Sequence, residues 1–138
     1  MVSAMNFIEI TKNELIGVIS IDEQHQSMAL LVNKLYDKIL TADKKMIKNY
    51  LYKLLEVVEV HFENEENLMR STKFPGYFSH KLEHDRFYKQ MLSSTDRFSK
   101  GLETIGIEQL KGIRQWFFNH LELSDKKCGK YFIENGIS

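Results

Sequence analysis

DKKMIKNYLYKLLEVVEVHFENEENLMR, residues 43–70, carries an inward-facing side chain at every third or fourth position. Side chains at this spacing share one face of an α-helix, so the stretch predicts a long amphipathic helix. The stripe starts apolar but ends with His61 and Glu65, which lie four residues apart on the face expected to be buried. Its members are Ile47, Leu51, Leu54, Val58, His61, Glu65 and Leu68.

Three more stripes with helical spacing flank this one, and they predict helices over about 20–40, 77–99 and 107–127. Ser20 and Glu23 match a capping box, which is typical of a helix start. Asp43 ends a break in the pattern and is a suitable cap for the helix over 43–70. The inward residues of the three stripes are Ile21, His25, Met28, Val32, Leu35 and Ile39, then His80, His84, Phe87, Met91 and Phe98, then Leu110, Ile113, Trp116, Phe117 and His120.

Short connections join the four predicted helices, and the clearest is the turn at 73–76, which holds the only proline. Short loops make successive helices antiparallel neighbours. We therefore predict an all-α fold, an antiparallel up-down-up-down four-helix bundle with an N-terminal arm and a short C-terminal tail. The 138 residues fit one domain spanning 1–138, large enough for a core without disulfides.

The composition excludes several classes of function. Nineteen basic and nineteen acidic residues balance, so there is no basic excess for nucleic acid. No apolar run approaches the roughly 20 residues of a membrane span, and Met1–Asn6 lacks the features of a signal peptide. The single cysteine, Cys128, permits no internal disulfide and is expected to be inert packing in a reducing compartment. We expect a cytoplasmic protein that binds neither membrane nor nucleic acid.

All five histidines fall on or beside the inward stripes, and every predicted helix contributes one at least. Taken singly, each has an ordinary alternative: a lone helical histidine is usually a hydrogen-bonded core or surface residue, Asp125 is a surface carboxylate, and Trp116 with Phe117 is core. Burying so many titratable groups is costly unless partners compensate them. Their joint convergence favours a metal site built between facing helices.

The donor set indicates which metals fit. The absence of cysteine disfavours structural zinc, whereas imidazole suits iron, zinc, copper and nickel. Five imidazoles and two carboxylates exceed the needs of one ion. If both carboxylates bridge two ions, the protein supplies nine bonds, and one oxo or hydroxo bridge raises this to eleven. Two octahedral ions need twelve bonds, so one position stays open on the ion that has only two histidines.

Charge conservation favours reversible binding at such a pair. Dioxygen that took one electron from each Fe(II) and the proton of a hydroxo bridge would leave the net charge of the site unchanged. An uncompensated charge in the apolar core would be costly. An apolar pocket would also withhold the protons that drive release of peroxide. This favours a protein that carries dioxygen over an enzyme that reduces it.

With these residues the chain resembles the hemerythrin family, specifically the stand-alone bacterial hemerythrins, from about Phe7 to Phe132. Myohemerythrin, a member of that family, is a known example of the up-down-up-down bundle. The motifs that carry the resemblance are IDEQH at 21–25, HFENEE at 61–66, His80 with His84, and WFFNH at 116–120 followed by Asp125. All seven ligand positions of the family are filled.

The resemblance implies roles for these residues. His80, His84 and His120 would hold one iron, His25 and His61 would hold the other, and Glu65 and Asp125 would bridge the two with an oxo or hydroxo group. Dioxygen would bind reversibly at the two-histidine iron, for storage, delivery or sensing. The expected wall of the oxygen pocket is Trp116, Phe117, Phe62, Leu121 and Ile21.

Two other classes of function remain open: a di-iron redox enzyme acting on peroxide or nitric oxide, and a signalling module. Carboxylate-rich di-iron enzymes usually draw Glu-x-x-His motifs from the bundle. Histidine-rich pairs spaced by four favour the carrier, so we expect no enzymatic activity. The protein is expected to be a monomer or weak homo-oligomer, and the sequence identifies no protein partner.

Two residues depart from the family pattern, and one spacing departs from an ideal helix. Many relatives have tryptophan at the position of Ile10, and leucine is usual at the position of Phe117, so oxygen access and affinity depend on this chain's own residues. His120 and Asp125 are five residues apart, which turns their side chains about 140° away from each other on an ideal helix. We therefore predict a π-type or otherwise broken turn within 121–125.

Overall fold

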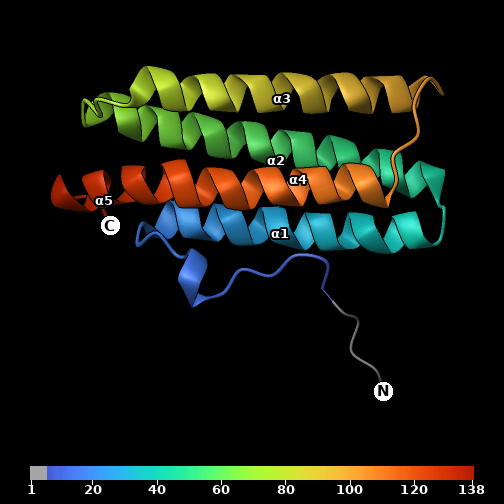
Figure 1. Cartoon of the computed structure of the whole chain (residues 1–138), viewed down its shortest axis with the longest axis horizontal. Coiled ribbons are helices and arrows are strands. Elements are labelled where there is room, and N and C mark those ends of the chain that lie inside the picture. Colours follow the sequence, from blue (N-terminus) through green and yellow to red (C-terminus); the bar gives the residue numbers. More distant parts are fainter. Residues whose placement is uncertain (1–5) are drawn as a thin grey trace.

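The computed structural model describes residues 6–138, in which the long elements are four helices lying side by side (Figure 1). Helix α1 packs against α2 and α4, and α2 packs against α3. This confirms the predicted all-α four-helix bundle. The expectation about a signal peptide at Met1–Asn6 falls mainly on residues 1–5, which lie outside the described range. The elements are η1 (Lys12–Glu14), α1 (Ile19–Leu40), α2 (Lys44–Ser71), α3 (Tyr77–Ser99), α4 (Ile107–His120), η2 (Leu121–Asp125) and α5 (Lys126–Glu134).

Local signals set the turn between α2 and α3 and the start of α2. The Asp43 carboxylate accepts a hydrogen bond from the backbone N–H of Met46 at 3.1 Å, which confirms Asp43 as the cap of α2. After α2, Phe74 turns inward and is 8% exposed. A Cβ atom at Gly76 would lie 2.8 Å from the Phe74 ring, so a larger residue here would have to displace that ring.

The predicted capping box at the start of α1 is wrong. The helix begins at Ile19, its N-cap is Val18, and no side chain caps it. Instead, the Asp22 carboxylate accepts hydrogen bonds from the backbone N–H groups of Ile16 and Gly17, at 2.9 and 3.1 Å. Burial of Val18 and these two bonds fix how the arm enters the helix, so a serine cap is unnecessary.

The helical part of the C-terminus is longer than predicted, because the last helix continues to Glu134 rather than ending near residue 127. Cys128, Gly129 and Phe132 are buried and pack against the end of the arm. A Cβ atom at Gly129 would lie about 3.0 Å from Ile16, so glycine permits this close approach. The helix extends because its inner face has a hydrophobic partner.

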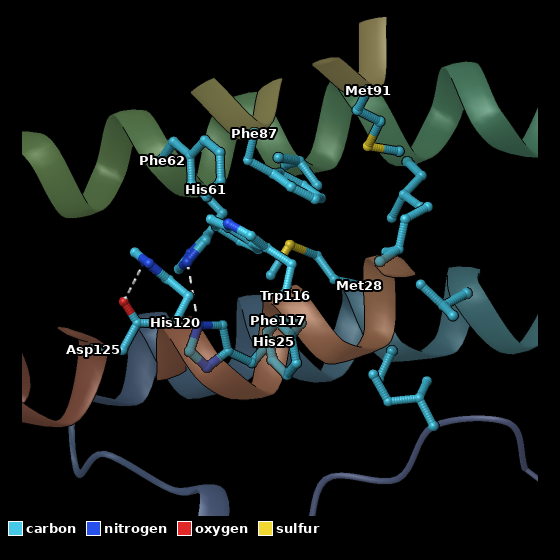
Figure 2. Close-up of a pocket in the computed structure, with 16 residues that line it drawn as sticks. His25, Met28, His61, Phe62, Phe87, Met91, Trp116, Phe117, His120 and Asp125 are labelled. Carbon is cyan, nitrogen blue, oxygen red and sulfur yellow. Dashed lines mark hydrogen bonds and ion pairs between the residues drawn. The ribbon is translucent and has the colours of Figure 1, made fainter. Parts of the chain in front are cut away.

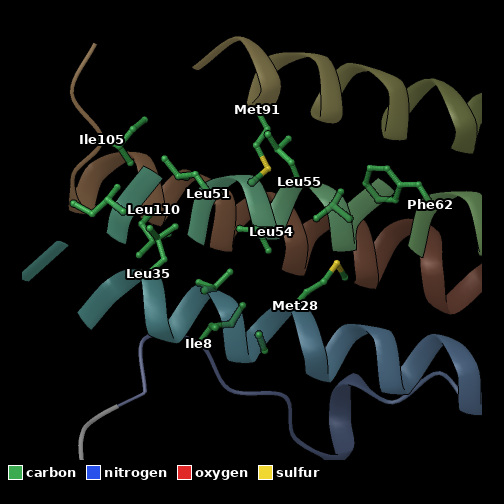
Figure 3. Packing of buried hydrophobic residues seen from close by; sticks show 14 residues of the cluster. Ile8, Met28, Leu35, Leu51, Leu54, Leu55, Phe62, Met91, Ile105 and Leu110 are labelled. Carbon is green, nitrogen blue, oxygen red and sulfur yellow. The ribbon is translucent and has the colours of Figure 1, made fainter. Parts of the chain in front are cut away.

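The apolar core divides into two clusters, and the histidine-bearing turns lie between them. On α1, His25 lies between Ile21 of one cluster and Met28 of the other, and on α2 His61 and Glu65 lie in the corresponding interval. Figure 3 shows the larger cluster, in which Leu35, Leu54 and Leu110 fill the space between helices. Water is therefore excluded from the middle of the bundle on both sides.

The N-terminal arm lies along α1 and α4 and closes the side of the bundle. Asn33 makes two hydrogen bonds with the backbone of Ile8, at 2.9 and 3.0 Å. Arg114 donates to the carbonyl of Phe7 at 2.8 Å and lies over its ring. Ile10 is partly buried against the larger core cluster. Within residues 6–138, no helix combines the length and apolarity that crossing a membrane requires.

The packing of α5 predicts a large stability effect at Phe132, which is fully buried. Phe132→Ala should lower the free energy of unfolding by about 3–5 kcal/mol, because it removes a buried ring and leaves a cavity. Urea unfolding followed by circular dichroism measures this. Ile133→Ala is the control, since Ile133 is 48% exposed, and it should cost less than half as much. Equal costs would mean that α5 is not part of the core.

Candidate metal centre

The seven predicted ligand residues come together in the middle of the bundle, and none is more than 4% exposed. Helix α1 supplies one, α2 and α3 supply two each, α4 supplies one, and η2 supplies the last. They form two overlapping groups whose donor atoms lie within 4.8 Å of one another. One group is His80, His84, His120, Glu65 and Asp125; the other is His25, His61, Glu65 and Asp125.

Each carboxylate belongs to both groups because its two oxygens point in different directions. Glu65 directs Oε1 to His84, at 3.3 Å from Nε2, and Oε2 to His61, at 3.5 Å. Asp125 directs Oδ1 to His120, at 3.0 Å, and Oδ2 to His25, at 3.3 Å. This is the arrangement expected of two carboxylates that bridge a pair of ions.

The predicted π-type turn is confirmed, since Leu121–Asp125 forms a π-helical segment between α4 and α5. The wider turn rotates Asp125 back toward His120, which an ideal α-helix would place on a different face. The hydroxyl of Ser124 does not bond back to a carbonyl of its own helix. It donates instead to the Glu83 carboxylate of α3, at 2.9 and 3.0 Å.

Three of the imidazoles are oriented by partners at their outer nitrogen. The Nδ1 atoms of His61, His84 and His120 lie 2.8, 2.9 and 2.8 Å from oxygens of Gln24, Glu66 and Glu83 respectively. These oxygens are acceptors, so each Nδ1 carries a proton and each Nε2 points inward.

Sequence reasoning assigned no role to Gln24, Glu66 or Glu83. The signal that points to them is their position. Each stands directly beside a predicted ligand in the chain, at the edge of a buried stripe, where a long polar side chain reaches the neighbouring helix.

The inward atoms fit bound cations. His25 and His61 face each other with their Nε2 atoms 3.2 Å apart, and His84 and His120 do the same at 3.2 Å. Two lone pairs at this distance repel unless a proton or a metal lies between them. Both oxygens of Glu65 and Oδ1 of Asp125 are buried, and the polar atoms beside them are imidazole nitrogens, which can donate to them only when protonated. Buried carboxylates in this state need positive charge, which metal ions supply.

The protonation states of the metal-free chain follow from the same geometry. Burial opposes protonation of His80, but hydrogen bonds with Asp125, Cys128 and Glu65 outweigh it and raise the pKa of His80 to about 12. The pKa of His84 is also raised, despite its burial, by Glu65 and Glu66. Burial lowers the pKa of His61 to about 4, so this ring is neutral at pH 7. The proton on His80, which the raised pKa of His84 reinforces, therefore offsets part of the buried carboxylate charge until metal replaces it.

A mainly apolar cavity of about 30 Å³ adjoins one side of this site (Figure 2). It reaches both histidines of the two-histidine group but only His120 of the other three. About 10–15 Å³ is enough for one water-sized sphere, so the cavity admits a diatomic molecule. Apolar walls of this kind stay dry.

The structure places three of the five expected wall residues on this cavity: Phe62, Trp116 and Phe117. Ile21 and Leu121 do not line it. Ile21 packs in the smaller core cluster, and Leu121 is fully buried within the π-helical segment. Residues that sequence reasoning did not assign to the wall complete it: Ile8, Met28, Ala29, Val32, Leu54, Val58, Phe87, Met91 and Ile113.

The missed wall residues have a common signal in the sequence. Met28 and Val32 follow His25 on its helical stripe, and Val58 precedes His61 on the next. These residues lie one or two turns from a ligand on the same helix face, on the side of the ligand layer where the larger core cluster lies. Phe117 also borders the site directly, since its ring contacts His25 edge-on with the centroids 5.1 Å apart.

Comparison with known proteins shows which family the chain is similar to. The model of the hemerythrin HHE cation-binding domain matches residues 17–131. The bacteriohemerythrin of Methylococcus capsulatus is 30% identical over 108 residues, covering 78% of this chain and 82% of that protein. The hemerythrin-like protein of Naegleria gruberi is 33% identical over 81% of this chain and 82% of its own length.

Solved structures agree with the sequence comparisons. A wild-type hemerythrin crystal structure superposes with a TM-score of 0.88 at 28% identity, covering 91% of this chain and 98% of that one. A leucine-to-phenylalanine mutant structure superposes with a TM-score of 0.90 at 29% identity, covering 93% and 98%.

The pKa shifts predict proton release when metal binds. At pH 7 His80, with a pKa raised to about 12, is protonated in the metal-free chain and must lose this proton to become a ligand. The raised pKa of His84 acts in the same direction. Anaerobic titration with Co²⁺ in weak buffer should release at least about one proton per chain, and metal affinity should rise with pH between about 6 and 8. A pH indicator reads the protons, with helix content checked by circular dichroism. Metal uptake without proton release would contradict the proposed protonation states.

Proposed function

Because this chain belongs to the hemerythrin family, we propose that it binds dioxygen reversibly at a non-haem di-iron centre, for storage, delivery or sensing. We propose that residues 1–138 form one such domain. We further propose a cytoplasmic monomer or weak homo-oligomer with no enzymatic role.

We assign the ligands by the grouping of the donor atoms. His80, His84 and His120 hold one iron, and His25 and His61 hold the other. Glu65 and Asp125 bridge the two irons, together with an oxo or hydroxo group. The direction of the carboxylate oxygens supports this, since each carboxylate sends one oxygen to each group.

The apolar cavity is the observation that carries the functional proposal. It lies against the two-histidine group, where the bond count leaves a coordination position free. A small apolar molecule in this cavity would therefore meet the only metal that can accept it. Of the other group only His120 lines the cavity, so a molecule inside it faces mainly the two-histidine side.

The side chains around the cavity favour release of the same molecule that entered. When bound, the iron pair supplies the electrons on which dioxygen binding draws. Phe62, Trp116 and Phe117 exclude water from the two-histidine side, and none of them carries an acidic proton. Gln24 holds the His61 ring through Nδ1 and keeps its Nε2 directed at the site. The one carboxylate on the lining, Asp125, is a proposed metal ligand, so the wall supplies no free acid that would protonate a bound ligand.

The first consequence concerns metal content and spectrum. We expect two irons per chain, about 3.5 Å apart as in other two-metal sites. The reduced protein should be colourless, gain visible absorption on exposure to air, and lose it again when oxygen is removed. Metal analysis and absorption spectroscopy measure these changes. One zinc per chain after iron-replete expression would overturn the proposal, and turnover of peroxide or nitric oxide would favour a redox enzyme instead.

The second consequence concerns Phe117, which contacts His25 and lines the cavity. Phe117→Leu should enlarge the cavity and change the oxygen off-rate or the autoxidation rate at least about threefold, with iron content unchanged. Stopped-flow absorbance measures both rates. Phe118→Leu is the matched control, because Phe118 packs on the core but does not line the cavity. If both variants keep the parent's kinetics, Phe117 does not limit the pocket.

A further inference from the structure

A groove between α3 and α4 lies directly outside the oxygen cavity. We propose that dioxygen enters and leaves the cavity through this groove, and that Met91 is the side chain whose movement opens the passage. The inference rests on the proposed oxygen binding and adds to it the residue that sets the rate of oxygen exchange. A passage is needed because none of the seven ligand residues is more than 4% exposed.

The groove and the cavity are separated by a wall that is one side chain thick. The groove has a volume of about 400 Å³, and four residues line both spaces: Phe87, Met91, Ile113 and Trp116. The backbones of α3 and α4 also approach each other at fewer places than those of the other neighbouring helices. A small molecule in the groove is therefore separated from the cavity by the movement of a single side chain.

The other three sides of the bundle are closed more firmly. The hollow between α2 and α3 meets the cavity at Phe62, whose ring stacks on His84 with centroids 3.8 Å apart. The hollow between α1 and α2 shares none of its described lining residues with the cavity. Between α4 and α1, Ile8 of the arm covers the cavity, and Asn33 holds its backbone by two hydrogen bonds. The described residues therefore leave the shortest way in between α3 and α4.

Three of the four shared wall residues are held by their neighbours or by their own shape. The Phe87 ring stacks on Trp116 with centroids 3.9 Å apart, and Trp116 stacks on His120 with centroids 4.5 Å apart. A movement of this aromatic pair would therefore disturb a ligand residue. Ile113 is branched at Cβ, which restricts rotation of its side chain. These three residues form the fixed part of the wall.

Met91 is the movable part of the wall. Its side chain is unbranched and has three rotatable bonds, so it adapts to irregular spaces. It is 5% exposed and reaches from α3 toward the cavity near Phe87 (Figure 2). A change of its rotamer opens the wall while both helices stay in place.

The passage is suited to small uncharged molecules. Polar side chains line the groove, among them Gln90, Gln109 and Glu103, whereas the four residues shared with the cavity carry no charge. An ion would have to lose its hydration at this apolar wall, which costs much free energy, and dioxygen has no such cost. The same wall keeps the cavity dry.

A residue that gates a passage has a specific kinetic signature. Dioxygen crosses the same barrier on its way in and on its way out, so a change in that barrier alters the association and dissociation rates by the same factor. The equilibrium affinity then stays the same. A residue that only shapes the bound state would change the affinity instead.

Stopped-flow mixing of the reduced, iron-loaded protein with dioxygen measures both rates. Met91→Ala should raise both at least about threefold, with the affinity within about twofold of the parent. Gly112→Phe should lower both at least about threefold, because the new side chain fills the groove. Gly112 lines the groove, it is exposed, and a Cβ atom there would meet nothing within 4 Å, so the fold should accept this substitution.

Leu92→Ala is the matched control for Met91→Ala. Leu92 is next to Met91 on α3 but is 36% exposed and lines neither the groove nor the cavity, so both rates should equal those of the parent. Unchanged rates in Met91→Ala or in Gly112→Phe would overturn the passage. Faster exchange in Asn33→Ala, which releases the arm, together with parental rates in Met91→Ala, would overturn it in favour of entry beneath Ile8.

Xenon distinguishes failure of this passage from failure of the proposed function. It occupies apolar cavities without needing a metal. Xenon-129 NMR should show that Gly112→Phe slows exchange between cavity and solvent at least about threefold, and equal exchange in this variant and the parent would overturn the passage. The proposed function is read separately, from the iron content and the oxygen spectrum of the parent.

Discussion

Two carboxylates, Glu65 and Asp125, lie inside the bundle among five imidazoles, and the described chain brings no lysine or arginine to them. Burying these charges without positive partners would cost several kcal/mol each. In the metal-free chain, the proton that His80 retains supplies part of this compensation, and the pKa of His84 is raised for the same reason. Two metal ions supply it more fully, so the bundle is a scaffold whose centre is completed by its metals. The two apolar clusters on either side hold the helices at the spacing at which either protons or metal ions can lie between the ligand residues.

Helical periodicity made most of this arrangement predictable. His61 with Glu65 and His80 with His84 share faces by spacing alone, and the mismatch between His120 and Asp125 was enough to predict the π-type turn. The ends of the helices were harder to predict, because they depend on contacts with buried residues that are distant in the sequence. Asp22 fixes the entry to α1 through the backbone of the arm, and Phe132 extends α5 because the arm covers it. Neither contact is visible in the local sequence.

The neighbours of the ligands were beyond sequence reasoning for a similar reason. Whether Glu83 points to His120 depends on the rotation of α3 against α4, which no stripe specifies. The cavity wall shows the same limit. Ile21 shares a stripe with His25, yet it lies on the opposite side of the ligand layer from Met28 and belongs to the smaller cluster. The position of a residue on a helical stripe predicts that it is buried. Whether it also lines the cavity depends on which side of the ligand residues the helices leave a space.

The outer partners of the imidazoles divide the centre into two unlike halves. In the three-histidine group, His84 and His120 donate to the carboxylates Glu66 and Glu83, which orient the two rings toward the site. In the two-histidine group, His61 donates to the neutral amide of Gln24, and Nδ1 of His25 is buried without a partner. A metal in the first group would therefore be held by rings with charged outer partners, whereas a metal in the second group would border the apolar cavity with less support.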